Sequence, residues 1–342
     1  MLLLGWRSEL LDLDMISIII PAFNEADGLR ELHQRVTACA TTWNEDYECI
    51  LVDDGSRDNT LSIAEALARA DRHLKIISLA RNFGHQAAVT AGLEHAKGDL
   101  IAILDADLQD PPEELQRFFH KCREGYDIVY AIRTKRKEGL VKRASYWFYY
   151  RLLATLSNVV IPLDSGDFCV MNRRAVDALN ALPERSRFVR GLRSWIGFRQ
   201  TGLTYERSAR AAGETKYTFR KLFQLGLDGI INFSSKPLRL IMVAGMLLGM
   251  LSFALAILVM VQYVGNFAIG GYNPHDAKGW TSLILAVLFL SSAQLFCLGI
   301  IGEYVGRLFE EVKRRPVYMV GHTVNLNTNN ERTKDNNTKN TE

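Results

Sequence analysis

The chain has 342 residues, of which 48% are hydrophobic, and a formal net charge of +3. This length is sufficient for one large domain and a further element, and the small net charge, with the lack of any DNA- or RNA-binding motif, argues against a nucleic-acid partner. The five cysteines are odd in number and have no paired metal-ligand spacing, so we expect free thiols and not a disulfide framework or a zinc site.

Residues 1–14 form an N-terminal extension ahead of the first predicted strand. Its apolar start is interrupted by Arg7 and Glu9, and it has neither a basic leader nor a clear small-residue cleavage site. We therefore expect no signal peptide.

Strands and helices are predicted to alternate from Met15 to about Tyr130. The predicted strands are 16–20, 49–52, 75–79, 100–104 and 128–131, and the predicted helices are 28–42, 60–70, 86–96 and 113–123. Continuous Ile, Val and Leu runs joined by helices are typical of a mostly parallel sheet with helices on both faces, which predicts an α/β fold. Such sheets bind their ligands at the carboxyl ends of the strands.

Polar residues follow four of these strands. The four segments are Pro21-Ala-Phe-Asn-Glu25, Asp53-Asp-Gly-Ser56, Arg81-Asn-Phe-Gly84 and Asp105-Ala-Asp107. Each of them alone could be a turn or a helix cap. Four charged strand ends together favour a single binding site at one edge of the sheet.

Asp105 and Asp107 follow an apolar run and are separated by one residue. In a strand, residues two apart point to the same face, so these carboxylates could converge on one hard cation whose oxygen shell a diphosphate completes. The chain lacks the Gly-x-Gly-x-x-Gly pattern after its first strand and has no Walker-type phosphate loop. We therefore expect a metal and side chains to neutralise phosphate charge, and hence metal-assisted chemistry on a nucleotide.

Two amphipathic, basic segments, about 141–161 and 217–236, combine aromatic and cationic residues. Such helices lie in the headgroup layer of a membrane, although each segment could instead pack on the globular domain. Basic residues lie before and between the two segments. They are Arg133, Lys135, Arg136, Lys137, Arg207, Arg210 and Lys216. They suit an anionic lipid phosphate, with a solvated basic face attracted to the membrane as the alternative.

Two uncharged apolar stretches, about 240–264 and 280–302, each cover the ~20 residues of a membrane-spanning helix. Basic residues flank the outer ends of the pair, so the positive-inside bias predicts an inner-membrane protein with its catalytic domain and both termini in the cytoplasm. Small residues at Gly245 and Gly249 would allow close helix packing within one chain or in a homo-oligomer. Residues 304–342 are predicted to be a basic segment that becomes a disordered tail after about Val320.

Several motifs together resemble one family. They are Ile20-Pro-Ala-Phe-Asn-Glu25, Val52-Asp-Asp-Gly-Ser56, Asp105-Ala-Asp-Leu-Gln-Asp-Pro-Pro112 and Gly213-Glu-Thr-Lys-Tyr217, followed by two apolar stretches. This combination is similar to family 2 glycosyltransferases of the polyprenyl-phosphate branch, which includes bactoprenol glucosyltransferase and dolichol-phosphate mannose synthase. The resemblance covers about residues 15–318 and implies a GT-A catalytic domain over 15–216.

The resemblance also implies a role for individual residues. The nucleotide-sugar site would consist of Pro21, Ala22, Asn24, Glu25, Asp53, Arg81, Asp105, Ala106, Asp107 and Arg133. Asp105, Asp107 and Gln109 would hold Mg²⁺ or Mn²⁺, and Arg136, Arg210 and Lys216 would bind the acceptor phosphate. Asp105, Asp107 and Asp167 would be the catalytic carboxylates.

The expected reaction is transfer of a hexose, with UDP-glucose as the expected donor, onto polyprenyl (undecaprenyl) phosphate in the lipid bilayer. The acceptor oxygen is already ionised near neutral pH, so it needs steering more than a base; Asp164 and Asp167 are the carboxylates left to orient it or to accept a proton. A single displacement predicts inversion at the anomeric carbon. GDP-mannose or UDP-pentose donors, a processive polysaccharide synthase and an inactive nucleotide-binding membrane scaffold are the alternatives.

Overall fold

The computed structural model of the protein describes residues 15–134, 165–185, 187–206, 236–265 and 279–326. These residues belong to two compact units, an α/β unit and a unit that contains two long helices. The predicted N-terminal extension and the first amphipathic segment lie outside the described residues, as do residues 217–235 of the second amphipathic segment and the end of the tail from 327.

The α/β unit is built on one eight-stranded mixed sheet with the strand order β7-β5-β6-β4-β1-β2-β3-β8. Its strands are β1 (Met15–Ala22), β2 (Asp46–Asp53), β3 (Leu74–Leu79), β4 (Leu100–Ile103), β5 (Ile128–Thr134), β6 (Ser165–Asn172), β7 (Gln200–Glu206) and β8 (Val320–Val324). Strands β4, β1, β2 and β3 are mutually parallel, as predicted. Strand β6 runs antiparallel to β4 and β5, and β8 runs antiparallel to β3.

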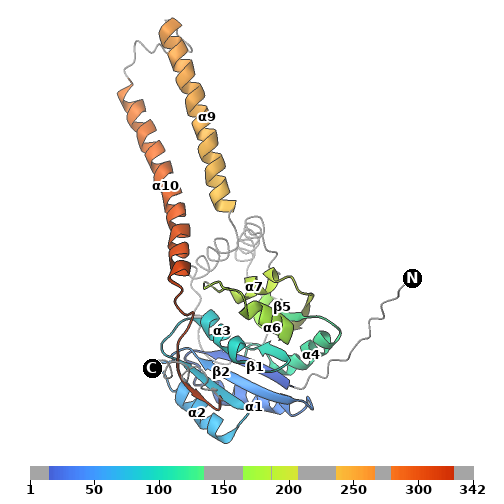
Figure 1. Ribbon diagram of the computed structural model, residues 1–342. Coiled ribbons are helices and arrows are strands. Elements are labelled where there is room, and N and C mark those ends of the chain that lie inside the picture. The colour runs from blue at the N-terminus through green and yellow to red at the C-terminus, as the bar shows by residue number, and fades with distance from the viewer. Residues whose placement is uncertain (1–14, 135–164, 186, 207–235, 266–278, 327–342) are drawn as a thin grey trace, which may run out of the picture. The chain divides into compact units, whose positions relative to one another are not determined.

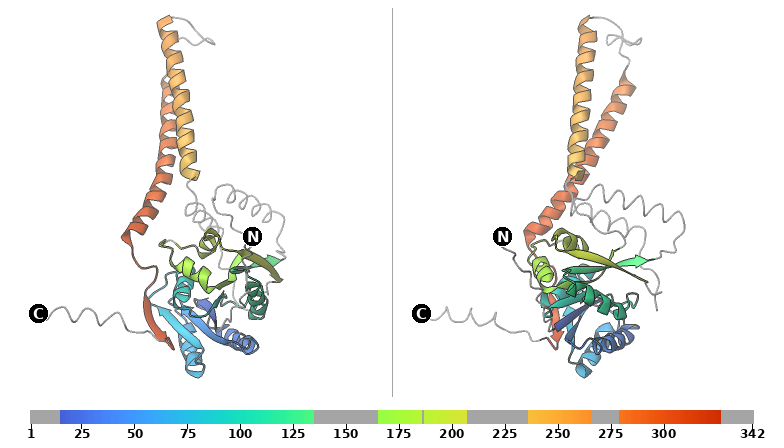
Figure 2. Two further views of the ribbon diagram at one scale, coloured as in Figure 1. Left: turned by 45° about the vertical axis from the view of Figure 1, so that its right-hand side comes forward. Right: turned by 90° about the vertical axis from the view of Figure 1, so that its right-hand side faces the viewer.

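Helices cover both faces of this sheet (Figures 1 and 2). They are α1 (Leu29–Ala40), α2 (Thr60–Ala70), α3 (His85–His95), the 3-10 turn η1 (Pro112–Glu114), α4 (Leu115–Arg123), α6 (Arg173–Asn180) and α7 (Val189–Trp195). The predicted strands and helices between Met15 and Tyr130 are all present, with ends shifted by a few residues. The elements from β6 to β7 lie outside the predicted set.

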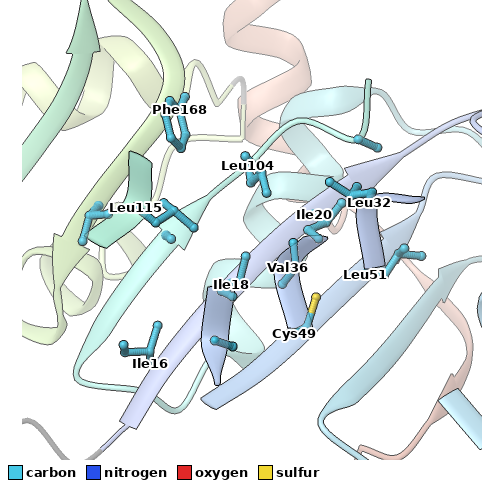
Figure 3. Close-up of a cluster of buried hydrophobic side chains, with 14 of the residues drawn as sticks. Ile16, Ile18, Ile20, Leu32, Val36, Cys49, Leu51, Leu104, Leu115 and Phe168 are labelled. Atoms are coloured by element: carbon cyan, nitrogen blue, oxygen red, sulfur yellow. The ribbon is translucent and has the colours of Figure 1, made fainter. Parts of the chain in front are cut away.

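Alternate residues of the strands supply the two halves of the core. Ile16, Ile18 and Ile20 of β1 are buried against Leu32 and Val36 of α1, within a cluster that also includes α4 (Figure 3). The opposite face of β1 packs on α3 at Gly92, where a Cβ would lie 2.2 Å from Ile19 Cγ2. Because apolar side chains fill both faces, polar ligands are left with the ends of the strands.

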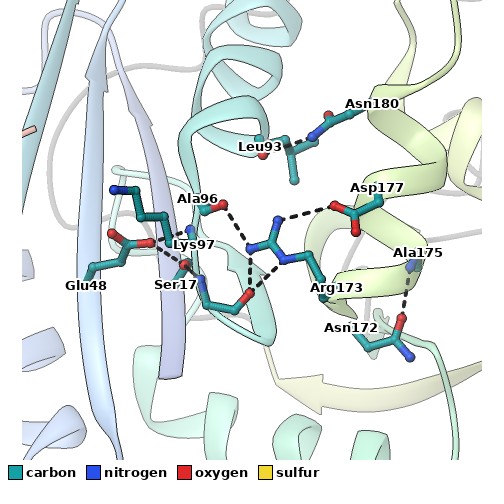
Figure 4. Close-up of polar contacts among 11 residues, drawn as sticks. Ser17, Glu48, Leu93, Ala96, Lys97, Asn172, Arg173, Ala175, Asp177 and Asn180 are labelled. Carbon is teal, nitrogen blue, oxygen red and sulfur yellow. Dashed lines mark hydrogen bonds and ion pairs between the residues drawn. The ribbon is translucent and has the colours of Figure 1, made fainter. Parts of the chain in front are cut away.

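A polar network fixes the end of the sheet at which the parallel strands begin (Figure 4). The buried Glu48 carboxylate accepts hydrogen bonds from Ser17 Oγ (2.6 Å) and the Lys97 amide (2.7 Å), and it pairs with the Lys75 ammonium. Arg173 donates to the Gly98 carbonyl (3.0 Å) and so ties α6 to the turn before β4. Every charge in this network has a partner, which is the condition for a buried carboxylate to stabilise a fold.

Strand β8 corrects the prediction of a disordered tail from about Val320. Val320–Val324 pairs with the outer edge of β3, and the Ala80 amide donates to the Met319 carbonyl (2.8 Å). The side-chain amide of Asn325 then donates to the carbonyls of Ala68 (2.7 Å) and Leu74 (2.9 Å). Backbone pairing with a sheet edge thus orders this segment, although the side chains of Val320 and His322 stay exposed.

The second unit contains α9 (Lys236–Gly265) and α10 (Trp280–Lys313). By length and composition, Ile241–Gln262 and Phe289–Lys313 could each cross a membrane, with mean hydropathies of 2.5 and 1.3. Neither window is buried within the structure, unlike the core helix of a soluble protein. Helix α10 continues beyond the predicted end at 302, because Arg307–Glu303 and Lys313–Glu310 pairs support its polar last turns.

All five cysteines are free, as the sequence predicted.

Replacement of Glu48 by Gln is expected to destabilise the α/β unit by about 2 kcal/mol, because the ion pair with Lys75 is lost in a buried site. The melting temperature of the detergent-solubilised protein, followed by tryptophan fluorescence, should fall by roughly 4–8 °C. Burial raises the pKa of Glu48, but hydrogen bonds from Lys75, Ser17 and Lys97 outweigh it and lower the pKa below the usual value.

The pH dependence tests this cause. A lowered folded-state pKa stabilises the protein above the unfolded value of about 4.3, and the contribution is lost as the pH falls through the folded-state pKa. The difference in stability between wild type and Glu48→Gln should therefore be largest at neutral pH and narrow below about pH 4. Glu124→Gln, which removes an exposed pair with Lys121, is the control and should change stability by less than about 0.5 kcal/mol. A difference that is independent of pH would contradict this explanation.

Replacement of Asn325 by Ala should release β8 from the sheet edge. Asn325 has a φ of +58°, which asparagine tolerates better than alanine, and its amide makes the two carbonyl contacts. We expect faster hydrogen exchange of residues 320–324 and of the paired strand β3, measured by mass spectrometry. Asn325→Gly keeps the backbone freedom but removes the amide, so equal exchange in Asn325→Gly and wild type would show that the amide does not hold β8.

Candidate active site

The register of the parallel strands brings the predicted strand ends to one edge. Ala22 at the end of β1 lies opposite Asp53 at the end of β2, and Asp53 lies opposite Ser78 of β3. The Leu104 amide donates to the Ile19 carbonyl (2.9 Å), which holds the chain leaving β4 beside β1. The loops after β1, β2, β3 and β4 therefore start side by side, as predicted.

Hydrogen bonds join the loop after β1 to the loop after β2. Asn24, with a φ of +55°, accepts a hydrogen bond from the Arg57 amide (2.8 Å), and its own amide donates to Ser56 Oγ (3.0 Å). The Glu25 amide donates to Thr60 Oγ1 (2.9 Å). The Asp53 carboxylate is buried and accepts a hydrogen bond from the Ser56 amide (3.3 Å). The polar residues predicted for the nucleotide thus form one connected rim.

The loop after β2 also holds the loop after β3. Asp54 accepts hydrogen bonds from the amides of Phe83 (2.7 Å) and Gly84 (2.9 Å), and burial raises its pKa. Gly55, with a φ of +67°, would bring a Cβ to 2.6 Å from the Arg81 carbonyl carbon, so only glycine fits there. The Arg81 guanidinium lies 4.2 Å from the centroid of Phe83 at the exposed edge. Asp54 therefore has a structural role at the site.

Asp105, Ala106 and Asp107 lie in a turn and not in a strand, because β4 ends at Ile103. The prediction that strand alternation brings the two carboxylates to one face is therefore wrong. Burial raises the pKa of Asp105 to about 6, and the charges of Asp110, Asp167 and Asp107 add to the increase. Asp107 accepts a hydrogen bond from the Gln109 amide (3.1 Å).

The donors at this turn fit a hard cation. Asp105 Oδ1 is buried and has no hydrogen-bond partner, a costly state for a carboxylate oxygen that a divalent cation would relieve. Within the described residues, no group of three or more His, Cys, Asp or Glu side chains is arranged to hold a metal. A cation at Asp105 and Asp107 would therefore need oxygens from a ligand, and a diphosphate has them.

Asp167 of β6 lies in a network that sequence reasoning missed. Its Oδ2 is 3.3 Å from His85 Nε2, and its Oδ1 is 3.3 Å from the Arg190 guanidinium. His85 Nε2 is also 3.9 Å from Asp105 Oδ1. The His85 imidazole therefore faces both Asp167 and Asp105, the predicted metal ligand.

The charges in this network shift the pKa values of its members. Burial opposes ionisation of Asp167, but Arg190, His85 and Arg193 together hold its pKa well below the usual range. Desolvation by neighbouring residues opposes the charged form of the partly exposed His85, yet Asp167 and Asp105 raise its pKa to about 9. His85 directly follows the polar segment after β3, so the sequence pattern could have placed it at the strand edge. Nothing in the sequence pattern placed Arg190 and Arg193 there, because α7 was not predicted.

The predicted acceptor residues Arg136, Arg210 and Lys216 lie outside the described residues, as does Asp164. Arg133 is described only by its backbone, which pairs with Tyr205 of β7. Their roles stay predictions.

Comparison with known proteins gives two family matches. Residues 17–179 match glycosyl transferase family 2, and residues 236–308 match the GtrB C-terminal hairpin. The first match contains β1 to β6, and the second contains α9 and most of α10.

Relatives align with most of the chain. An uncharacterised glycosyltransferase of Bacillus subtilis, YkcC, is 43% identical over 89% of this chain and 92% of the relative. The bactoprenol glucosyl transferase of Shigella phage SfII is 36% identical over 89% of this chain and 97% of that protein. Among solved structures, glucosyl-3-phosphoglycerate synthase of Mycobacterium tuberculosis has a TM-score of 0.45 at 19% identity, over 64% of this chain and 78% of that one.

The mixed sheet with helices on both faces is thus a GT-A domain, as the resemblance implied. With matching domains and relatives over nearly its full length, the chain belongs to glycosyltransferase family 2, in the group that carries the GtrB C-terminal hairpin.

Proposed function

We propose that the protein is an inverting, metal-dependent glycosyltransferase that moves a hexose from a nucleoside diphosphate onto a polyprenyl phosphate. UDP-glucose and undecaprenyl phosphate are the proposed substrates. The names of the bactoprenol glucosyl transferases that it resembles support the sugar and the lipid. The proposed metal dependence rests on one observation: Asp105 Oδ1 is buried without a hydrogen-bond partner, with His85 Nε2 3.9 Å away, at the edge where the four loops start.

The donor is proposed to lie across the ends of β1, β2 and β4. The connected rim of Asn24, Glu25 and Asp53 would hold the nucleoside, with Pro21, Ala22, Arg81, Ala106 and Arg133 completing the site. Asp105, Asp107 and Gln109 would bind Mg²⁺ or Mn²⁺ at the diphosphate. The ion, when bound, would stabilise the charge of the departing nucleoside diphosphate.

The acceptor is proposed to be a phosphate on a lipid. Its oxygen is ionised near neutral pH, so binding and charge relief by Arg136, Arg210 and Lys216 would matter more than proton removal. Helices α9 and α10 would keep the enzyme in the inner membrane, with the catalytic domain on the cytoplasmic side. Attack in a single displacement would convert an α-linked donor into a β-linked lipid sugar.

A panel of radiolabelled nucleotide sugars, each incubated with purified protein, Mg²⁺ and undecaprenyl phosphate, tests the substrates. We expect label from UDP-glucose in the lipid fraction, with the β configuration at the new linkage. Label from GDP-mannose or a UDP-pentose would replace the proposed donor, and an α-linked product would contradict single displacement. Nucleotide binding without transfer from any donor would favour the scaffold alternative.

Replacement of Asp105 by Asn should lower kcat/KM by about 10²–10³-fold, because an amide is a weaker cation ligand and carries no charge. The same change should leave the melting temperature unchanged or raise it, since a buried, ionised carboxylate oxygen without a hydrogen-bond partner opposes folding at neutral pH. The rate is measured by the lipid-extraction assay and stability by thermal unfolding. Asp46→Asn, an exposed change at the other end of β2, is the matched control and should affect neither. Full activity of Asp105→Asn would exclude this residue as a metal ligand.

A further inference from the structure

Asp167 has contacts on both carboxylate oxygens. Oδ1 accepts a hydrogen bond from Arg190 Nε (3.3 Å) and also faces Arg190 Nη2 (3.3 Å). Oδ2 faces His85 Nε2 (3.3 Å) and accepts a long hydrogen bond from Gln86 Nε2 (3.5 Å). A carboxylate that already receives these cations and donors is poorly placed to take a proton from an acceptor.

Gln86 links this carboxylate to two helices. It is the second residue of α3, and its Oε1 accepts a hydrogen bond from the amide of Val189, the first residue of α7 (2.8 Å). His85 begins α3 and Arg190 is the second residue of α7. The side chains of His85 and Arg190 therefore come from adjacent helix starts that Gln86 and Asp167 hold together.

The imidazole of His85 and the guanidinium of Arg190 are more exposed than the carboxylate between them. The side chains of His85 and Arg190 are 42% and 25% exposed, whereas that of Asp167 is 13% exposed. Asp167 thus contacts His85 and Arg190, and the side chains of both stay partly exposed to solvent. His85 Nε2 also lies 3.9 Å from Asp105 Oδ1, at the turn where the donor diphosphate is proposed to bind.

We propose that His85 and Arg190 form a phosphate-binding pair that Asp167 holds in place, so that Asp167 is a positioning residue and not a proton acceptor. This inference rests on the proposed function and names side chains that would bind phosphate in that site. The site must receive two groups that carry phosphate, the donor diphosphate and the acceptor phosphate, and donors with accessible N–H groups bind either. The low pKa of Asp167 agrees with this role, because a weak base accepts a proton poorly.

The first test asks whether the pair binds the phosphate of the donor. Calorimetry measures the binding of UDP and of uridine to the full-length protein in detergent with Mg²⁺. His85→Gln and Arg190→Gln should weaken UDP binding by about 10- to 100-fold, the range of charge-assisted hydrogen bonds, and leave uridine binding unchanged. His85→Lys, which keeps a cation, should recover part of the loss. GDP and guanosine replace these probes if the donor panel identifies a guanosine sugar.

The KM for undecaprenyl phosphate tests whether the pair instead binds the phosphate of the acceptor. If UDP binding is unchanged while this KM rises 10- to 100-fold in both variants, the pair binds the acceptor phosphate. If neither UDP affinity nor the acceptor KM changes, the proposal is overturned. Gln34→Ala, an exposed change on α1, is the control for substitution in a helix.

A double-mutant cycle tests the role of Asp167. If Asp167 positions His85, Asp167→Asn should shift the same binding constant as His85→Gln, and the double variant should be no worse than the more damaging single variant. A proton acceptor would instead lower kcat without a change in phosphate binding, and its effect would multiply with that of His85→Gln. Gln86→Ala, which leaves the charges in place, should give a milder form of the Asp167→Asn defect, and it replaces Asp167→Asn in the cycle if that variant does not fold.

The wild-type protein distinguishes failure of this inference from failure of the proposed function. Wild-type protein that transfers no sugar would overturn the proposed function together with this inference, whereas an active wild type with unaffected variants would overturn the inference alone.

Discussion

The site depends on the register of four parallel strands. Backbone pairing sets Ala22 opposite Asp53 and Asp53 opposite Ser78, and it brings the end of β4 beside β1. If one strand slipped by a residue, its side chains would turn to the other face of the sheet and the loop after it would start at a different place on the edge. The apolar alternation of β1, with Ile18 facing α1 and Ile19 facing α3, makes such a slip costly.

Buried charge is distributed differently at the two ends of this sheet. At the end where the parallel strands begin, the Glu48 carboxylate is fully partnered, and the result is stability. At the end where they finish, Asp105 Oδ1 has no hydrogen-bond partner, and its pKa is raised to about 6. A carboxylate oxygen that is buried without a hydrogen-bond partner costs folding free energy, which is expected where a ligand compensates it.

Asp105 and Asp167 show how two carboxylates a short distance from a shared imidazole acquire different properties. Asp105 is raised in pKa because burial and neighbouring carboxylates outweigh His85. Asp167 is lowered because two arginines and His85 outweigh burial. The balance of partners, and not burial alone, sets the direction in which the pKa of each carboxylate moves.

The sequence determined the family, the alternation of strands and helices up to β5, the strand ends that carry polar residues and the two apolar helices. These features are local or periodic. A run of Ile and Val, or the spacing of Asp105 and Asp107, can be recognised in the sequence without knowledge of the tertiary contacts. The order of β8 and the network around Asp167 were decided only by the tertiary structure. Val320–Val324 is ordered by an edge of β3 far away in the chain. His85, Gln86 and Arg190 reach Asp167 across separations of 82, 81 and 23 residues. Such contacts depend on how helices cross the sheet, and no local pattern of residues encodes that packing.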